Sequence, residues 1–393
     1  SSGPPKFGGA RKSHCRTSDA RGVLTRYTHD ALGRLTRAAH SDGSATDYLY
    51  DQGPYGLGRL TSIRDPQGIH TAWTYDPAGR IITINQTVPL GPPNLNARRP
   101  GSPRTSTLTQ SLQYQYSTPS GQRLHLIYPS GKILSYRYAP ASQTLEAISF
   151  DGQRVAEQIR WHPSLTQGPA APSSMLLANA ARWTSRLDTY GRVVSYTLGG
   201  QELNLAWDHL NRLIAQTSTV SAQNQSYTYD PLDRLIGFDS PGRNQRFVYD
   251  MNGNLLDKTD RIGQNPEQRY PYRIEPDSNR LTQIENLGIG YGFDAAGNRT
   301  QTPSLTHTYD ARGRLIKTVA AQGGRSKVYH YLINALGQRV AKLGPEGTTV
   351  FAYDQDGQLI GEYDTQGRAQ AEYIWLPTQN GAGPTYRPIA VVQ

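Results

Sequence analysis

Aspartate recurs along this sequence at one fixed place in a short motif, and these carboxylates are the side chains with the clearest capacity for chemistry. About ten copies are present, usually with an aromatic residue before the Asp and with Gly, Asn or Asp three positions after it. Two neighbouring carboxylates could act as general acid and base, and a group of them could bind calcium. The D-x-[DN]-x-[DN]-G calcium loop is absent from the sequence. Because every Asp occupies the same place in its motif, we expect each one to hold its own turn.

The other residue types that commonly carry chemistry are scattered. No two histidines have the spacing of zinc ligands, no G-x-S-x-G nucleophile motif occurs, and the one cysteine, Cys15, excludes an internal disulfide framework. We therefore predict no catalytic residue, no cofactor-binding residue and no metal ligand, and we expect that the chain is not an enzyme. The nine histidines are His14, His29, His40, His70, His125, His162, His209, His307 and His330.

The element that must position these aspartates is a β-hairpin. Its pattern is clearest in residues 227–258, where two copies of the motif follow one another and begin at Asp230 and Asp250. Aromatic residues alternate before each Asp, as they do on one face of a strand. The Asp and the Gly or Asn that follows it are turn residues, and an apolar second strand leaves the turn. We expect the Arg after the turn, such as Arg234, to lie across a neighbouring aromatic ring or to pair with an Asp, and so to connect successive hairpins.

The motif recurs from one end of the chain to the other, and several successive copies have nearly the same spacing. A regular period in the range of about 20 to 50 residues indicates a repeat architecture, and the spacing here lies at the short end of that range. We therefore predict an all-β fold, in which repeated hairpins form one continuous strip. The turns begin at Asp19, Asp30, Asp51, Asp65, Asp76, Asp151, Asp188, Asp208, Asp230, Asp250, Asp277, Asp294, Asp310, Asn334, Asp354 and Asp364.

Proline-rich and irregular segments divide the array. We interpret residues 1–16 as an N-terminal tail and residues 17–393 as the repeat strip. The strip is interrupted near 89–104 and near 163–182, because so much proline is incompatible with a central strand. The second interruption ends in Met175–Arg182, whose composition predicts one short helix. The sequence does not begin with Met and has no signal peptide at its start, so we expect it to be part of a longer protein.

Composition and charge limit the classes of partner that the chain is expected to bind. Tyr (25 residues) outnumbers Phe (6) and Trp (5), which suits half-buried strand faces where a hydroxyl group finds a partner. The net charge of +10 comes from 41 Lys and Arg against 31 Asp and Glu, and many of the arginines belong to the motif. Because the longest basic clusters are only Arg11-Lys12 and Arg98-Arg99, we predict no specific nucleic-acid site. No run of about 18 apolar residues is present, so we predict no transmembrane segment.

At these motifs the sequence resembles the YD-repeat, or Rhs, family, which includes bacterial Rhs polymorphic toxins, the C components of insecticidal Tc toxin complexes and the teneurins. The resemblance covers roughly residues 17–393, and phrases such as YDARGRL at 309–315 and YDQDGQLIGEYD at 353–364 are similar to those of bacterial members. The segment from Glu372 to Trp375, together with residues 387–392, is similar to the part of bacterial Rhs proteins that precedes their closing motif.

The resemblance implies a strip that spirals into a hollow shell or part of one. In toxin members such a shell holds a C-terminal toxin, which an aspartyl-protease-like site at the end of the core releases. That site's motif is not in this sequence, so no catalytic residue is carried over. We expect a shell fragment that encapsulates a toxin polypeptide for interbacterial or secreted delivery. Its partners would be the rest of its own polypeptide or a cleaved cargo, and its location would be outside the cell or on its surface.

An alternative stays open. The tyrosine-rich strands and the unpaired backbone groups of the first and last strands fit a surface adhesion or glycan-binding protein. In that case the partners would be glycans, or further copies of the chain that assemble through open strand edges.

Overall fold

The computed structural model describes residues 15–91, 106–163, 171–322, 324–377 and 387–393. Almost all of the regular structure is β-strand, joined by short turns, as the repeat pattern predicts. The strands are β1 Cys15–Ser18, β2 Leu24–His29, β3 Leu35–His40, β4 Ala45–Tyr50, β5 Leu60–Arg64, β6 His70–Tyr75, β7 Ile81–Pro89, β8 Thr107–Tyr116, β9 Arg123–Ile127, β10 Ile133–Tyr138, β11 Leu145–Phe150, β12 Gln153–Trp161, β13 Pro172–Leu177, β14 Arg182–Leu187, β15 Val193–Leu198, β16 Gln201–Trp207, β17 Leu213–Ser218, β18 Gln225–Tyr229, β19 Leu235–Ser240, β20 Arg243–Tyr249, β21 Leu255–Ile262, β22 Gln268–Ile274, β23 Leu281–Ile284, β24 Ile289–Gly290, β25 Gly292–Phe293, β26 Arg299–Gln301, β27 Leu305–Tyr309, β28 Leu315–Gln322, β29 Arg325–Ile333, β30 Arg339–Gly344, β31 Gly347–Tyr353, β32 Leu359–Tyr363, β33 Ala369–Leu376 and β34 Arg387–Val392, with two single-turn 3-10 helices, η1 Ser221–Gln223 and η2 Glu285–Leu287.

All of the strand pairs are antiparallel and join strands that are consecutive in the sequence. The pairs form a 24-stranded sheet and a 10-stranded sheet. A register shift recurs just before the motif turn: Thr228 pairs with Gly237, but the next residue, Tyr229, pairs with Leu235. Such bulges bend a strand and increase its twist. The same bulge in successive repeats therefore curves the strip in one direction.

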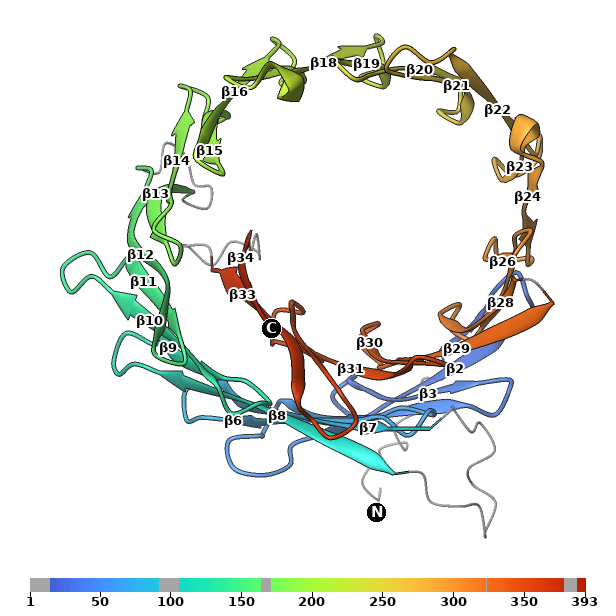
Figure 1. Cartoon of the computed structure of the whole chain (residues 1–393). Coiled ribbons are helices and arrows are strands. Elements are labelled where there is room, and N and C mark those ends of the chain that lie inside the picture. Colours follow the sequence, from blue (N-terminus) through green and yellow to red (C-terminus); the bar gives the residue numbers. More distant parts are fainter. Residues whose placement is uncertain (1–14, 92–105, 164–170, 323, 378–386) are drawn as a thin grey trace, which may run out of the picture.

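The curved strip closes into a ring (Figure 1). Strands β29–β33 lie on the inner side of the N-terminal strands β2–β10, so the wall there has two layers. Two apolar clusters join these layers. One contains residues such as Ile63, Leu112 and Leu126 with Ile360 and Ile374. The second is made of Ile69, Val88, Leu332, Val340, Ala341, Leu343 and Val350.

The rest of the ring, the free arc at residues 193–301, is a single layer. Leu203 is the one apolar side chain among those described in this arc that is buried. Strand β18 shows the usual pattern: half-exposed Gln225, Tyr227 and Tyr229 alternate with exposed Ser226 and Thr228. The compact core of this fold therefore lies where the strip overlaps itself, and the free arc is held mainly by contacts within the sheet.

Closure differs from what the sequence suggests. The chain lacks the family's closing motif, yet it closes by packing one face of the strip against another. The outer edges of the first and last strands do not pair with each other in this closure. Strands β1 and β34 therefore each have one hydrogen-bonded neighbour among the described strands. No helix in the described part of the chain is long and apolar enough to cross a membrane.

Three local predictions are wrong. The predicted helix at Met175–Arg182 is instead the end of β13, a turn and the start of β14, because Met175 is buried and pairs with Trp183 across the hairpin. The predicted tail ends earlier, since β1 begins at Cys15. The turn assigned to Asp277 is led by Glu275, whose N–H donates to Arg280 O at 2.8 Å. Most of the two predicted interruptions, residues 92–104 and 164–170, and the tail residues 1–14 lie outside the described residues.

Candidate functional site: the turn ladder, the closing seam and the inner wall

Most motif turns are held by their own Asp, as predicted. Asp65 and Asp277 are exceptions, because the Asp65 carboxylate accepts Ala335 N of another repeat and the turn assigned to Asp277 is led by Glu275. In the turn at 230–234, Asp230 N donates to Arg234 O at 3.0 Å, while one carboxylate oxygen, Oδ1, accepts the N–H groups of Leu232 and Arg234 at 2.9 and 3.0 Å. The other oxygen, Oδ2, accepts Arg234 Nε at 2.6 Å. Desolvation raises the pKa of Asp230, but hydrogen bonds from the backbone and side chain of Arg234 outweigh it and hold the pKa below its usual value. The carboxylate is therefore an anchor of its turn.

The motif arginine also reaches the next repeat. Nη1 of Arg234 donates to Asp250 O, the backbone oxygen of the following motif Asp, at 2.7 Å. The guanidinium carbon lies 5.0 Å from the centre of the Tyr249 ring. The sequence predicts that this arginine covers an aromatic ring or pairs with an Asp, and the structure shows both contacts. The same turn-to-turn bond links Arg192 to Asp208 O at 3.1 Å and Arg212 to Asp230 O at 3.2 Å.

The aromatic residue before the Asp makes a second connection in the opposite direction along the strip. Tyr249 donates its hydroxyl proton to Leu235 O at 2.9 Å, and Trp207 donates its indole N–H to Val193 O at 2.8 Å. Each acceptor lies at the start of the outgoing strand of the preceding repeat, so successive hairpins are tied together on one face. This aromatic ladder consists of Tyr75, Tyr116, Tyr138, Trp161, Trp207, Tyr229, Tyr249, Tyr309, Tyr353 and Trp375.

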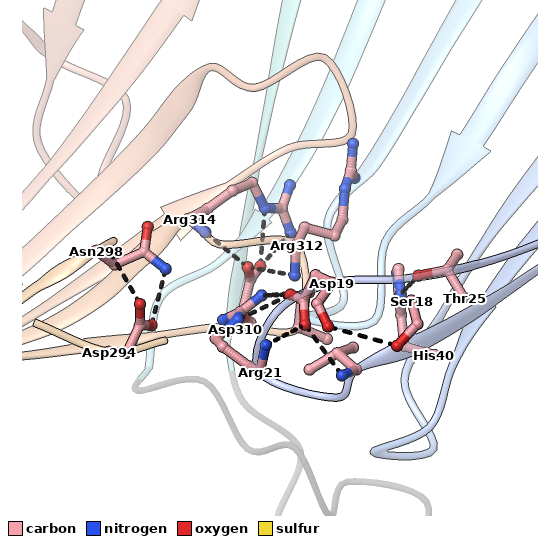
Figure 2. A network of polar contacts seen from close by, with 12 residues as sticks. Ser18, Asp19, Arg21, Thr25, His40, Asp294, Asn298, Asp310, Arg312 and Arg314 are labelled. Atoms are coloured by element: carbon pink, nitrogen blue, oxygen red, sulfur yellow. Dashed lines mark hydrogen bonds and ion pairs between the residues drawn. The ribbon is translucent and has the colours of Figure 1, made fainter. Parts of the chain in front are cut away.

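The arginine ladder has a gap at the turn 294–298, and a distant residue fills it. Asn298 takes the arginine position and donates to its own Asp294 at 2.8 Å. The carbonyl of the next motif residue, Asp310 O, instead accepts Nη1 of Arg21 at 2.8 Å, and Ala311 O accepts Nη2 of Arg21 at 2.8 Å. Arg21 is itself held by Asp19 at 2.6 Å (Figure 2). An arginine from the first turn of the strip thus completes the ladder far along the chain and joins the start of the strip to the turn between β27 and β28.

Polar contacts accompany the apolar clusters across the seam, by which we mean the contact between the N-terminal strands and β29–β33. Tyr114 Oη accepts Gln355 N at 2.8 Å, and Tyr128 Oη donates to Tyr373 O at 2.9 Å. Further seam contacts are Ala335 N to Asp65 at 2.8 Å, Ile333 N to Gln67 at 3.0 Å, Gln86 to Phe351 O at 3.2 Å, Arg123 with Asp356 at 3.1 Å and Lys132 with Glu372 at 3.4 Å.

Two motif carboxylates are buried in this seam. Burial raises the pKa of Asp65 to about 6, against the opposing effect of Arg314, and burial likewise raises the pKa of Asp354 to about 6. A cavity of about 50 Å³ borders Asp354 and is also lined by Gln86 and Gln110. Both side-chain polar atoms of Gln110 are buried without a protein partner among the described residues. The seam is therefore the part of the ring most sensitive to protonation.

The face that carries the aromatic ladder points into the ring. Tyr114 and Tyr116 of β8 both bond to Gln355, at 2.8 and 3.3 Å, and so face the C-terminal layer. That layer lies on the inner side of the N-terminal strands (Figure 1). In the C-terminal layer itself, Val350 and Ala352 are the side chains of β31 that join the apolar clusters. The outer face of the last repeats therefore covers the ladder face of the first ones.

Strand pairing carries this orientation into the free arc, because directly paired residues lie on one face of a sheet. The ladder residues Trp207, Tyr229 and Tyr249 are thus on the inner wall, together with Tyr227 and Phe238, whose ring centres are 5.7 Å apart. Amide side chains lie between the rings. In register with these aromatics are Gln216, Gln225 and Gln245. The inner wall is therefore a half-exposed aromatic surface with amide groups. It also carries one charged group, in which Asp260 pairs with Arg243 and Lys258.

The described residues contain no group of three or more His, Cys, Asp or Glu side chains arranged to hold a metal ion. Four histidines share hydrogen bonds with hydroxyl groups of nearby strands, in the pairs His40 with Thr25, His125 with Ser135, His162 with Ser185 and His307 with Thr318. The absence of catalytic, cofactor and metal residues remains a prediction from the sequence.

Known proteins share both the repeat and the ring. Residues 55–91 match the RHS repeat, and residues 171–374 match the teneurin YD-shell. The chain is 26% identical over 409 residues to double-stranded DNA deaminase toxin A of Burkholderia cenocepacia, covering 85% of this chain and 27% of that protein. It is 26% identical over 447 residues to the probable deoxyribonuclease RhsA of Dickeya dadantii, covering 95% of this chain and 29% of that protein. The chain thus spans less than a third of the length of these two relatives.

Solved structures confirm the fold. The Tc holotoxin pore of Photorhabdus luminescens superimposes with a TM-score of 0.71 at 13% identity, over 96% of this chain and 21% of the other. A crystal structure of TcdB2-TccC3-Cdc42 superimposes with a TM-score of 0.69, also at 13% identity, over 96% of this chain and 23% of the other. These matches confirm the predicted all-β strip of hairpins that curves into a shell. From the YD-shell match, which covers more than half of its length, the chain belongs to the teneurin YD-shell family.

Proposed function

We propose that this chain is a section of a container that surrounds a polypeptide, and that it carries out no catalysis itself. One observation carries the proposal: the strip closes into a ring whose free arc turns half-exposed aromatic rings and amide side chains inward. Aromatic faces bind apolar side chains of many kinds, and amides exchange hydrogen bonds with any backbone. Such a wall suits an extended or unfolded chain of variable sequence better than one defined ligand.

The cargo we propose is a toxin polypeptide, delivered outside the producing cell. This part of the proposal rests on the names of relatives, which describe a deaminase toxin and a probable deoxyribonuclease. It also rests on the share of those proteins that the chain spans, because the remainder of each relative is long enough to include a separate toxin domain.

The adhesive alternative keeps its open strand edges, because β1 and β34 each have one hydrogen-bonded neighbour among the described strands. Face-to-face packing through Val88, Leu332 and Val350, each with 0% of its surface exposed, nevertheless closes the strip into a ring and so favours the container. Binding of glycans by the tyrosine-rich face remains an alternative outcome of the experiment below.

The test uses a permanently unfolded protein, reduced and carboxymethylated α-lactalbumin, as the probe. Native mass spectrometry of the purified chain mixed with the probe is expected to show a complex of fixed ratio, and the bound probe should resist protease. Gln216 and Thr217 are neighbours on opposite faces of β17. Glu introduced at the inner position (Gln216→Glu) should repel the acidic probe and weaken retention, while Thr217→Glu on the outer face should not.

Two results would overturn the proposal. The first is a probe that does not bind the wild-type chain, especially if the chain is retained on glycan columns instead. The second is an equal loss of binding with Gln216→Glu and Thr217→Glu, which would place the contact outside the ring.

A further inference from the structure

Large apolar side chains stand exposed at the tips of four successive motif turns, the first just before the free arc and the other three within it. A turn tip is normally polar, and apolar residues that gather on a surface mark an interaction site. These four residues, which we call the apolar rim row, are Tyr190 (81% exposed), Leu210 (52%), Leu232 (68%) and Met251 (98%).

The hydrogen bonds of the ladder fix the row. Turn 188–192 is bonded to turn 208–212, which is bonded to turn 230–234, which is bonded to turn 250–254. All four turns therefore lie side by side on one rim of the ring. Each tip is held outward because the motif Asp accepts a backbone N–H within the turn, for example that of Leu232 at 2.9 Å. The exposure is thus built into the turns.

The opposite rim of the same arc has a different composition. Its turns contain Gly199, Gly200, Gly242 and Gly263, all but Gly242 with positive φ. Its exposed large apolar residues are Val220 (38%), Ile262 (56%) and Leu287 (50%). The two rims therefore differ in degree: on the rim of the motif turns four successive tips each carry a large apolar residue, and three of these are more exposed than any on the opposite rim.

We propose that the apolar rim row is a docking surface for the same row of a second copy of this chain, in a two-fold symmetric contact. The first argument is spacing. Successive tips are separated by two strands, or ~9.5 Å, which leaves room between neighbouring tips for one side chain from a partner with the same period. The same row of a second copy has this period, so that a shift of half a repeat places its tips between the tips of the first copy.

The second argument is charge. The chain carries a net charge of +10, which opposes self-association in general. On this rim, however, three of the four motif carboxylates are paired with their own arginines, at 2.7 Å for Asp188 and at 2.6 Å for Asp208 and Asp230. The fourth, Asp250, is held by Asn254 at 2.7 Å. Two such rims therefore approach each other without a strong like-charge repulsion.

The third argument is a precedent within the chain. Turns of this kind already dock on one another without strand pairing within the chain, where Arg21 of turn 19–23 donates to Asp310 O and Ala311 O of the turn between β27 and β28. An isologous contact buries both rows at once and forms a closed dimer.

Sedimentation velocity across the micromolar range tests the proposal. The wild-type chain is expected to dimerise, and the triple variant Leu210→Ser, Leu232→Ser, Met251→Ser should raise the dissociation constant at least tenfold. The matched control on the opposite rim, Val220→Ser with Ile262→Ser, should leave it unchanged. Met251→Ser alone, at a fully exposed position, provides a weaker variant that keeps the fold. In a Cys15→Ser background, cysteines placed singly at the four tips should give a disulfide-linked dimer from at least one position.

Three outcomes would overturn the proposal. The wild-type chain is monomeric throughout the concentration range, or the triple variant dimerises as well as the wild type, or assembly continues into filaments. Filaments would indicate a rim meeting an unlike surface, because a two-fold contact stops at the dimer.

Discussion

Replacing Arg21 by Ala should release the N-terminal hairpin from the ring. The side chain of Arg21 is 16% exposed and donates one 2.8 Å hydrogen bond to Asp310 O and one to Ala311 O. A hydrogen bond from a charged donor contributes about 1.5–3 kcal/mol. Water can replace the arginine at both carbonyls, so we expect the two bonds together to stabilise the contact by about 2 kcal/mol. Because about 1.4 kcal/mol corresponds to a factor of ten, local opening of the hairpin should become about 30-fold more frequent.

Hydrogen exchange measures this opening directly. In Arg21→Ala the amides of β1 and of turn 19–23 should exchange about 30-fold faster, while those of the free arc keep their rates. Arg16→Ala, at an exposed arginine of the same hairpin, is the matched control. Asn298→Arg gives the neighbouring turn its own arginine, which should compete with Arg21 for Asp310 O and loosen the hairpin without removing Arg21. Equal exchange in the Arg21 and Arg16 variants, or no effect of Asn298→Arg, would refute the view that Arg21 fills the gap in the ladder.

Three further predictions concern the seam and the ladder. The folded-state pKa of about 6 for Asp354 lies above its unfolded value of about 3.9, so its contribution to stability is complete below about pH 4 and is lost as the pH rises through 6. Thermal unfolding of Asp354→Asn should therefore show roughly 3 kcal/mol more stability than wild type at pH 7 and little difference at pH 4. Equal gains at both pH values would contradict the view that a buried acid causes the effect. Tyr249→Phe removes the 2.9 Å hydrogen bond to Leu235 O and should lower the free energy of unfolding in urea by about 1 kcal/mol. The control Tyr190→Phe, at an exposed turn tip, should change it by less than about 0.5 kcal/mol. Similar losses in both variants would mean that the ladder bond is not stabilising. Lys132→Met leaves the fully buried Glu372 without its cation at 3.4 Å and should lower the free energy of unfolding by about 3 kcal/mol. The double variant Lys132→Met, Glu372→Gln should recover at least about 1 kcal/mol of that loss. Additive losses would exclude energetic coupling between the two residues.

The repeating part of the fold is predictable because its rules are local. An alternating strand, an Asp that accepts N–H groups of its own turn, and a residue with positive φ three positions later define a hairpin without reference to the rest of the chain. Positive φ at Asp233, Asn211 and the motif glycines follows this rule. The contact of Arg234 with Tyr249 is also within reach, since it spans one repeat.

Interactions that depend on the path of the whole strip are not predictable in this way. Met175–Arg182 has the composition of a helix, but burial of Met175 beside Trp183 overrides that propensity. The role of Arg21 depends on curvature accumulated over most of the strip, from the first turn to the turn that contains Asn298. Asn298 stands where many other turns have arginine, but so do Asn254, Gln338 and Gln358. Nothing local therefore identifies this gap or the residue that fills it.

The place where the ring closes, by contrast, can be predicted from the order of apolar and polar residues in the strands. A strand with one covered face alternates between apolar and polar residues, whereas a strand covered on both faces loses that alternation. Strand β18 alternates in exposure along its whole length, but β31 buries Val350, Phe351 and Ala352 in succession. In β31 one face packs on the N-terminal strands and the other carries the ladder aromatics, so consecutive apolar residues mark the point at which the strip overlaps itself. The number of residues between strands β5–β7 and β31 is the length of strip that forms the ring. That length sets the width of the space that the inner wall surrounds.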